Sequence, residues 1–363
     1  MKFGLFMMPV HYPGKGLPRT IKEDMTTVIL ADELGFDEAW IGEHYTITWE
    51  NLPAPELFIA QALARTRNIK LATGVILLQL HDPKMLAHRM AMLDHLAEGR
   101  FYFGIGTGGV PTEFDFFGID EEKRHARAAD VIEAVLKIWE AEGDLDYRGE
   151  FHNVRSPQPV PEAGLRLWMK PYTQPHPPIA VAGVSRNSST IEWAGEHGWI
   201  PLSTDILPIE DVSTHWDAYT RGAARTGKTA DRREWRVCLD IHVAETTEQA
   251  RHDVLEHGMG RTFEQYFFPL FKRAGMMDLV KPDPSMPDEA VTVEYLLDNR
   301  WVVGDPDHCV RKIREAYDTV GGFGTLLQLS QDWDPPEKGW KSLELLSKHV
   351  MPELRDLAPG APG

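Results

Sequence analysis

The sequence predicts an α/β barrel in which eight parallel strands alternate with helices, and three observations favour this fold class. Short apolar runs alternate with longer stretches of helical periodicity along most of the chain, which is typical of βα units. Eight such runs can be distinguished, the number that closes a (β/α)8 barrel. The segment after the first run reads Met8-Pro9-Val10-His11 and is not the glycine-rich phosphate loop of an open doubly wound sheet.

The first half of the chain contains the more regular elements. Residues 21–35 have the apolar spacing of an amphipathic helix, and Gly35 at their end can adopt the left-handed conformation that terminates helices. Strands are predicted at residues 3–8, 37–43, 69–78 and 101–105, and helices at 21–35, 55–64 and 83–96. Parallel strands joined in this way are covered by their helices.

The second half repeats the pattern less regularly. Strands are predicted at 178–182, 198–202, 235–243 and 324–329, and helices at 187–197, 209–225, 246–258 and 340–357. Two stretches interrupt it: the proline-rich residues 142–177, interpreted as a long loop, and residues 263–299. We interpret them as insertions after strands four and seven of a single domain, residues 1–363. Long insertions at the C-terminal ends of barrel strands are usually lids or interface elements.

Composition and charge exclude several classes of protein. With 42% apolar and 26% charged residues the chain is globular, and its net charge of −17 disfavours binding to nucleic acids and anionic membranes. Cys238 and Cys309 are far apart and predict neither a disulfide nor a cysteine zinc site. The sequence has neither a signal-peptide pattern nor an apolar run of about 18 residues, so we expect a cytoplasmic protein.

The residues Glu43 and His44 are candidates for catalysis. Active-site residues of a barrel follow the C-terminal ends of its strands, and these two follow the second predicted strand. An imidazole there can act as an acid, a base or a hydrogen-bond donor near neutral pH, although it can also simply anchor a loop. Glu43 either orients His44 or is a buried structural carboxylate.

Glycine and hydroxyl residues follow the fourth and fifth predicted strands. The run Gly104–Gly109 contains Gly106 and Thr107 and permits either a tight turn or a close approach of backbone to a ligand. After strand five, Val184 and Arg186 are accompanied by the hydroxyl residues Ser185, Ser188, Ser189 and Thr190. One of these hydroxyls must cap the next helix. The others, with free amides and the arginine, can bind an anion, most commonly a phosphate.

Metal and acyl-transfer chemistry are not favoured. His88 and His95 lie on one face of the predicted helix 83–96, close to His81 and Asp82, but no further ligand is indicated. Serine-based acyl transfer would require a G-x-S-x-G motif between a strand and a helix, which the chain lacks. We therefore predict no metal site.

Aromatic residues near the predicted mouth of the barrel suggest an apolar substrate pocket, with ordinary core packing as the alternative. They are Tyr12, Tyr45, Trp49, Phe114, Phe116, Phe117 and Trp301. We select Tyr12, Tyr45, Trp49 and Phe114 as candidates for substrate binding.

Several motifs resemble those of the bacterial luciferase-like flavin monooxygenases. They are residues 2–6, 33–37, 40–44 and 96–101 and the glycines after strand four, and the match spans nearly the whole chain. Within this family the chain is most similar to the diketocamphane and limonene monooxygenase branch, through residues 47–53, 271–278 and 342–348. The resemblance implies a (β/α)8 barrel, commonly dimeric.

The resemblance also implies a cofactor, reduced FMN delivered by a separate NAD(P)H:flavin reductase. O2 would add at the flavin C4a to give a peroxide that oxygenates the substrate, while the protein holds the flavin and excludes water. His44 would stabilise the peroxide or donate to a substrate oxygen. Thr73 and Gly74 would lie along the flavin ring, where the family often has a non-prolyl cis peptide, next to Gly106 and Thr107.

The same resemblance implies that the phosphate is bound by the loop after strand five, with Val184, Ser185, Ser188 and Ser189. Luciferases hold the phosphate with an arginine after strand four, where this chain has Thr107. Either Arg186 replaces that arginine or the phosphate is held by amides and hydroxyls alone.

We therefore predict a two-component, FMNH2-dependent monooxygenase that oxygenates a hydrophobic cyclic ketone or terpenoid-like substrate, by Baeyer–Villiger oxidation or a related reaction. Two alternatives remain open. The first is a deazaflavin-dependent oxidoreductase that transfers hydride without O2. The second is a non-catalytic flavin-binding subunit, against which the presence of His44 argues. We expect a homodimer that binds neither nucleic acid nor membrane.

Overall fold

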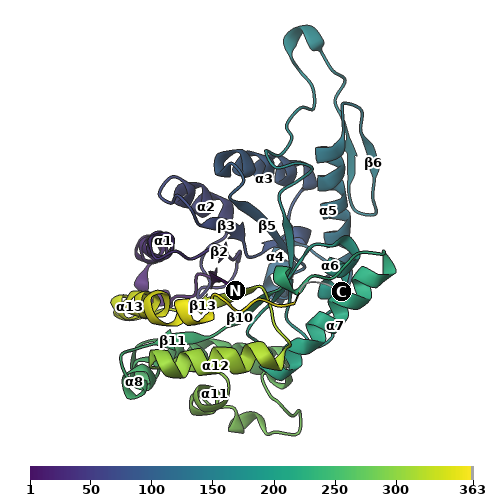
Figure 1. The fold of residues 1–363 in the computed structure, drawn as a ribbon. Coiled ribbons are helices and arrows are strands. Elements are labelled where there is room, and N and C mark those ends of the chain that lie inside the picture. Colours follow the sequence, from purple (N-terminus) through teal and green to yellow (C-terminus); the bar gives the residue numbers. More distant parts are fainter. Residues whose placement is uncertain (361–363) are drawn as a thin grey trace.

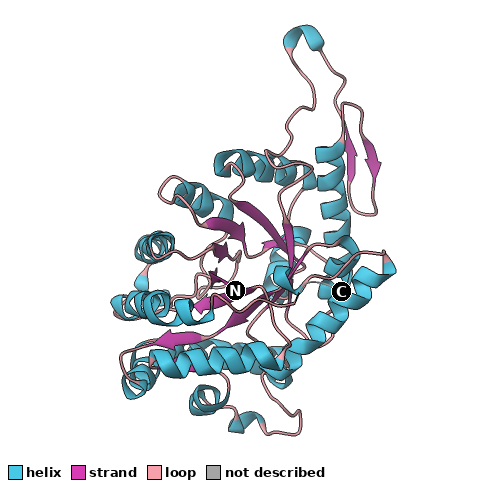
Figure 2. Ribbon diagram, in the orientation of Figure 1, coloured by secondary structure: helices cyan, strands magenta, loops and turns pink. Residues whose placement is uncertain are grey.

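The computed structural model describes residues 1–360 and has a closed barrel of eight parallel strands surrounded by helices (Figures 1 and 2). In order around the barrel, the strands are β1 (Lys2–Met7), β2 (Glu38–Ile41), β3 (Lys70–Thr73), β5 (Phe101–Gly106), β8 (Ile179–Gly183), β9 (Ile200–Ser203), β10 (Arg236–Leu239) and β13 (Thr325–Ser330). The barrel closes where β1 pairs with β13, with Lys2 opposite Thr325. The predicted fold class is confirmed, and each of the eight predicted runs contains one barrel strand.

The outer layer of helices agrees with the sequence periodicity to within a few residues for six elements. They are α1 (Leu17–Glu33), α2 (Pro55–Leu63), α3 (Pro83–Ala97), α6 (Ser189–His197), α7 (Ile209–Arg225) and α8 (Thr247–His257). Gly35, with φ of +79°, ends α1 as expected. The predicted C-terminal helix is α13 (Glu337–Leu345), a π-helical turn and α14 (Met351–Leu354). No helix within residues 1–360 combines the length and apolar character needed to cross a membrane.

Six helices of the described residues were missed by the sequence periodicity. They are α4 (Pro111–Phe117), α5 (Arg124–Glu140), α9 (Met259–Thr262), α10 (Phe268–Ala274), α11 (Val293–Asn299) and α12 (Pro306–Thr319). Four of them, α4, α9, α10 and α11, have seven residues or fewer, so they span about two turns at most and give too few repeats for the period of 3.6 residues to be recognised.

Two of the predicted strands are interrupted at the mouth of the barrel. The run 69–78 divides into β3 and β4 (Ile76–Leu77), and a non-prolyl cis peptide bond joins Gly74 to Val75 between them. The run 235–243 divides into β10 and β11 (Ile241–Val243), and β11 leaves the barrel to pair with β12 (Val302–Gly304). The prediction of one continuous strand at each place was wrong, because apolar character persists past each break, whether the chain stays in the sheet, as β4 does by pairing with β5, or leaves it, as β11 does.

The interior of the barrel is packed with side chains and closed at its N-terminal end. Phe6, Trp40 and Tyr102 fill the interior, so the barrel encloses a core and not a channel. Glu38 and Arg236, the first residues of β2 and β10, form an ion pair of 2.8 Å between Oε1 and Nη2, and the indole of Trp40 donates to Glu38. A ligand can therefore enter only at the C-terminal end.

The two insertions differ in their relation to the barrel. Residues 142–177 form an arm that projects away from it (Figure 1), and contain an antiparallel hairpin of β6 (Asp146–Arg148) and β7 (Asn153–Arg155) that the expectation of a loop did not include. The second insertion, residues 263–299, follows α9 (Met259–Thr262) and contains a π-helical turn η6 (Phe263–Phe267), α10 (Phe268–Ala274) and α11. It packs around its own apolar cluster, which includes Phe263 and Trp301.

Candidate active site

The loop after β2 places His44 between two carboxylates. His44 Nδ1 lies 3.1 Å from Glu113 Oε1, and Nε2 lies 3.1 Å from Glu50 Oε2. Main-chain hydrogen bonds fix the loop, with the His44 amide 3.1 Å from the Leu52 carbonyl and the His11 amide 2.7 Å from the Trp49 carbonyl. Both carboxylates are buried, with 5% of Glu50 and 1% of Glu113 exposed. The imidazole is therefore held in one orientation by both ring nitrogens.

The charges around His44 perturb the protonation of all three groups. Burial by itself lowers the pKa of His44, but the charges of Glu50 and Glu113 outweigh it, so the pKa is raised. Burial raises the pKa of Glu50. The pKa of Glu113 is lowered, because its contact with His44 and hydrogen bonds from the Tyr45 and Thr46 amides outweigh burial. The surroundings therefore favour the ionised form of Glu113 and disfavour that of Glu50.

Glu43 lies apart from His44 and binds other groups. Its carboxylate accepts hydrogen bonds from the Leu77 amide at 2.7 Å, from the Tyr45 hydroxyl at 2.9 Å and from His81 Nε2 at 2.9 Å. The side chain is 1% exposed. Of the two readings of Glu43, the geometry therefore favours a buried carboxylate that ties the loop after β2 to the loop after β4.

The ends of β3 and β5 approach each other more closely than side chains would permit. Thr73 is buried and its hydroxyl donates to the Gly104 carbonyl at 2.7 Å. A Cβ on Gly104 would lie 1.9 Å from the Thr73 carbonyl oxygen, and one on Gly106 would lie 2.6 Å from a methyl of Val75. The barrel wall therefore presents backbone at this point of the mouth. Gly74 follows Thr73 in the chain, and Thr107 follows Gly106.

The loop after β8 has the features of an anion site. Ser188 caps α6 by accepting from the Ile191 amide at 3.3 Å, whereas Val184, Ser185 and Ser189 are exposed. Within residues 1–360 the amides of residues 184, 185, 186 and 188 have no acceptor. Free amides and hydroxyls at the start of a helix attract an anion.

A buried histidine fixes the position of this loop. In His215 of α7, Nδ1 lies 2.8 Å from the Ser203 hydroxyl and Nε2 lies 2.8 Å from the Ser185 carbonyl oxygen. Burial lowers the pKa of His215. The neutral imidazole thus bridges the end of β9 to the loop after β8.

Arg186 is already engaged with protein groups. Its guanidinium forms an ion pair with Asp211 at 2.6 Å and donates to the Asp278 and Lys281 carbonyls at 2.9 and 2.8 Å. It therefore ties the loop after β8 to the second insertion. Of the two possibilities left open for a phosphate, binding by amides and hydroxyls fits this arrangement better.

The opposite half of the mouth has acidic residues that the sequence did not suggest. Asp205 follows β9 and Asp240 follows β10, and their carboxyl groups are hydrogen-bonded to each other. The Gln331 amide donates to Asp240 Oδ1 at 3.0 Å. Burial and the proximity of Asp205 raise the pKa of Asp240, and burial raises the pKa of Asp205. Two carboxyls in such contact do not ionise independently, and each disfavours the charge on the other.

Aromatic rings cover the mouth between the loop after β2 and the second insertion. Trp49 stacks on Tyr266 with centroids 5.5 Å apart, and Tyr12 meets Trp49 edge-on at 5.7 Å. Tyr45 packs edge-on against Phe117 at 4.8 Å. Phe114, by contrast, is 2% exposed and lies beneath Gly108, so it supports the glycine turn instead of facing open space.

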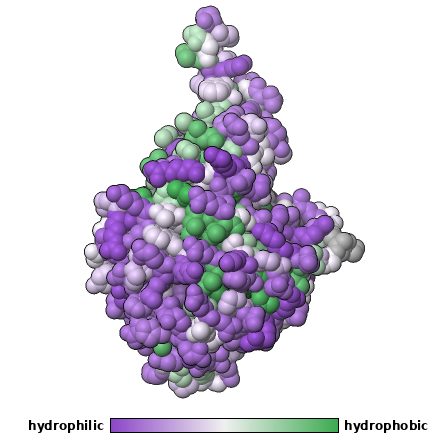
Figure 3. All heavy atoms as spheres, turned by 60° about the vertical axis from the view of Figure 1, so that its left-hand side comes forward, coloured by the Kyte–Doolittle hydropathy of each residue, from purple (hydrophilic) through white to green (hydrophobic). Residues whose placement is uncertain are grey.

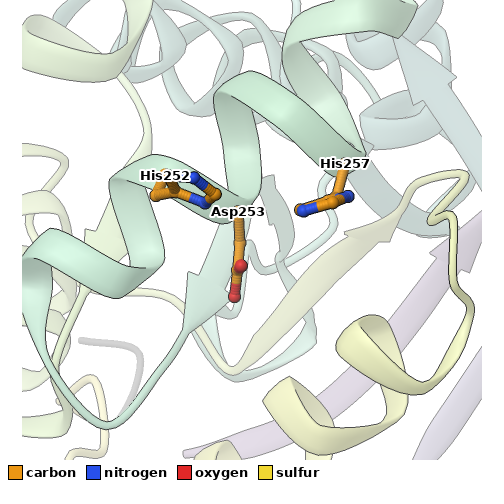
Figure 4. A group of neighbouring side chains, drawn as sticks. All are labelled: His252, Asp253 and His257. Carbon is orange, nitrogen blue, oxygen red and sulfur yellow. The ribbon is translucent and has the colours of Figure 1, made fainter.

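Two groups of side chains have ligand atoms close enough together for a metal ion. One is His252, Asp253 and His257 on and after α8 (Figure 4), and the other is His11, Glu23 and Asp332. In each, a lysine ammonium already neutralises the carboxylate: Lys338 lies 2.6 Å from Asp253, and Lys15 lies 2.6 Å from Asp332. Neither arrangement favours a cation.

The predicted site residues come from four strands that are consecutive around the barrel, β2, β3, β5 and β8. The structure brings their ends to one half of the mouth, and Tyr12 lies beside Trp49. The sequence missed Glu50, Glu113, Asp205, Asp240 and Tyr266. Asp205 and Asp240 follow strand ends and could have been found by the same rule, whereas Glu113 and Tyr266 lie on helical segments whose position depends on tertiary packing.

A parallel barrel with a histidine between carboxylates and an anion loop at its C-terminal mouth defines an α/β-barrel enzyme. The chain belongs to the luciferase-like monooxygenase family, whose model matches residues 1–322. The predicted family and the predicted class of enzyme, a monooxygenase, are confirmed.

Curated relatives and a solved structure support this assignment along the whole chain. The chain is 33% identical to 4-hydroxyprotoasukamycin monooxygenase of Streptomyces nodosus subsp. asukaensis, covering 99% of this chain and 94% of the relative. It is 32% identical to 3,6-diketocamphane 1,6-monooxygenase of Pseudomonas putida, covering 98% of each. The crystal structure of the oxygenating constituent of the Pseudomonas putida 3,6-diketocamphane monooxygenase, a type II Baeyer–Villiger enzyme in complex with FMN, superposes with a TM-score of 0.91 at 33% identity and 99% coverage of both chains.

Proposed function

We propose that this protein is the oxygenating component of a two-component monooxygenase, which uses reduced FMN and O2 to oxygenate a hydrophobic cyclic ketone or terpenoid-like substrate. The observation that carries the proposal is the presence, at one barrel mouth, of His44 between two carboxylates and of an anion loop with unsatisfied amides. The FMN in the related diketocamphane monooxygenase supports the choice of cofactor.

The residues at the mouth fit a flavin mononucleotide. The amides of residues 184, 185, 186 and 188 and the hydroxyls of Ser185 and Ser189 would hold the phosphate at the start of α6. Gly104 and Gly106 allow β5 to pack closely against Thr73 and Val75, and the flavin ring would lie against the backbone at this part of the mouth. The buried amide of Gln79, next to Gly108, has no partner among the described residues, which is typical of a site that a ligand or water completes.

The bound flavin would supply the electrons that activate O2, and the protein would supply position and charge. His44 would be the group that donates a proton or hydrogen bond to oxygen, since its raised pKa favours the protonated ring. Glu113 and Glu50 orient both ring nitrogens. Trp49 and Tyr266 exclude water above the site and give it an apolar wall.

The reaction requires a partner that reduces the flavin. The segment after β1, Met8–His11, offers no glycine-rich loop for a nicotinamide dinucleotide. A separate NAD(P)H:flavin reductase would therefore deliver reduced FMN. Residues 1–363 would act as one domain, of which 361–363 lie outside the described residues.

We also propose a homodimer formed through α2 and α3. Leu57, Met85, Met92 and Leu96 are more than half exposed on these helices, and the last three recur on one face of α3. The helices lie on the side that Figure 3 brings forward, where hydrophobic side chains gather below the projecting arm. Met92→Glu should give a monomer in light scattering after gel filtration, whereas Leu255→Glu on α8 should not. A monomeric wild type would contradict the dimer.

The test of the activity uses isotopically labelled O2. The protein is loaded anaerobically with reduced FMN, mixed with labelled O2 and a set of cyclic ketones and terpenes, and the products are analysed by mass spectrometry. We expect one labelled oxygen atom in a product, and far less labelled product with His44→Gln. Release of hydrogen peroxide without any oxygenated product, or binding of a reduced deazaflavin in preference to reduced FMN, would contradict the proposal.

A further inference from the structure

The side chain of Tyr266 connects the second insertion to His44 through Glu50. Tyr266 lies in the π-helical turn η6, and its hydroxyl donates to Oε1 of Glu50. The other carboxylate oxygen of Glu50, Oε2, lies 3.1 Å from Nε2 of His44. A hydrogen-bonded chain thus runs from the insertion to the imidazole.

Packing against neighbouring aromatic rings fixes the position of the Tyr266 ring. The ring is 7% exposed and lies parallel to Trp49, with an interplanar angle of 12°. The ring of Phe267 is also adjacent, at 4.7 Å between centroids and tilted by 45°. Because both neighbours are apolar, the hydroxyl has Glu50 as its partner, and the hydrogen bond forms only when the insertion is seated on the mouth.

We propose that Tyr266 is a positioning residue, whose hydroxyl holds the Glu50 carboxylate against His44 and so couples the seating of the second insertion to the charge on the imidazole. The inference rests on the proposed function, in which His44 donates to oxygen. It predicts that the protonated form of His44 is favoured when the second insertion covers the mouth, and is favoured less when the insertion is displaced.

The surrounding charges explain why one hydroxyl has this influence. Glu50 is buried and also feels the negative charges of Glu113 and Asp205, so only His44 and Tyr266 favour its ionised form. His44 in turn feels Glu50, Glu113 and Glu43. Without the Tyr266 hydroxyl, Glu50 would take up a proton more readily. His44 would then lose one of its two charged partners.

The experiment compares Tyr266→Phe with Tyr295→Phe in the FMN-free protein. Tyr295 belongs to the same insertion and its hydroxyl has no hydrogen-bond partner among residues 1–360, so it controls for the loss of a hydroxyl. The titration of His44 is followed by long-range proton–nitrogen NMR of histidine-labelled protein, with the signal assigned by its loss in His44→Gln. We expect Tyr266→Phe to lower the pKa of His44 by about one unit, the order of effect of one hydrogen bond to a carboxylate, and Tyr295→Phe to leave it unchanged.

A second variant keeps the inference testable if Tyr266→Phe disturbs the insertion. Glu50→Gln removes the charge but keeps the shape, so it should lower the pKa of His44 as well, and the double variant should lower it no further. An unchanged pKa of His44 in Tyr266→Phe, or additive shifts in the double variant, would overturn the inference. A shift in the NMR titration together with a wild-type protein that oxygenates nothing would instead refute the proposed function alone.

Discussion

The two ends of the barrel contain buried charged groups in opposite arrangements. At the N-terminal end Glu38 and Arg236, each with a side chain 1% exposed, form a pair of equal and opposite charges. At the C-terminal end His44 faces two carboxylates, and Asp205 and Asp240 lie in contact without a cation bonded to either carboxyl group within the described chain. The same fold therefore buries a matched pair of charges at one end and an excess of carboxyl groups at the other.

The difference separates structural from functional use of charge. A matched pair keeps both groups ionised over a wide pH range, and the two partners offset each other's cost of burial. An excess of acid shifts the pKa of its members, costs stability, and is found where protons are held or moved. On this basis the C-terminal mouth is the reactive end of the molecule. Three substitutions test the contrast.

The largest effect is expected for His44→Gln. Loss of the only cationic side chain between Glu50 and Glu113 should reduce turnover by about 10²- to 10⁴-fold, the usual contribution of a general acid, with little change in FMN affinity. In the wild type, activity that needs the imidazolium should fall as the pH rises through the raised pKa of His44. The rate of product formation as a function of pH checks both the loss of turnover and the pH dependence, with His88→Gln, which changes an exposed histidine, as the control. A wild-type profile in His44→Gln would remove His44 from the mechanism.

The next effect, at the other end of the barrel, is on stability and not on turnover. Arg236→Met leaves Glu38 buried and unpaired, which should cost about 3–5 kcal/mol, measured by urea denaturation. Adding Glu38→Gln should recover much of the loss, since a neutral amide can still accept from Trp40. Activity per folded molecule should stay at the wild-type level in both variants. A loss of activity in the double variant would show that the two ends are not independent.

The sequence predicted the strands and His44 better than it predicted the side chains that contact His44. The strand that begins at Glu38 and the candidate His44 follow from apolar periodicity and from the position of strand ends, which are local properties. The partners of His44 do not, because Glu113 is 69 residues away along the chain and the orientation of its helix depends on packing of Tyr45 against Phe117. Tyr266 is more distant still, 216 residues from Glu50, and belongs to an insertion whose path no local pattern specifies.

The loop after β8 illustrates the intermediate case. The cluster of hydroxyl residues correctly predicted a helix cap, and Ser188 provides it. Which of the remaining hydroxyls are free could not be predicted, because that depends on the αL conformation of Asn187, with φ of +51°, and on the anchoring of the Ser185 carbonyl by His215. The ion pair of Arg186 with Asp211 was equally beyond the sequence, since it depends on how α7 packs beside this loop and not on the bounds of α7, which were predicted.

The smallest of the three effects is expected for Asp240→Asn, and its sign is opposite to that of Arg236→Met. Burial and Asp205 raise the pKa of Asp240 in the folded state. The folded protein therefore holds a proton that the unfolded chain releases near pH 4, so the wild type loses stability as the pH rises from that point toward the raised pKa. Asparagine can still donate to Asp205 and accept from Gln331 without needing a proton.

Asp240→Asn should therefore be more stable than the wild type at pH 7, by about 1–3 kcal/mol, and the advantage should disappear as the pH falls to 4. The exposed Asp115→Asn should show no such trend. Urea denaturation at a series of pH values measures the difference. If Asp240→Asn destabilises the protein equally at all pH values, the pair of acids acts as a stabilising hydrogen bond. The two ends of the barrel would then differ in the position of their buried groups and not in their charge.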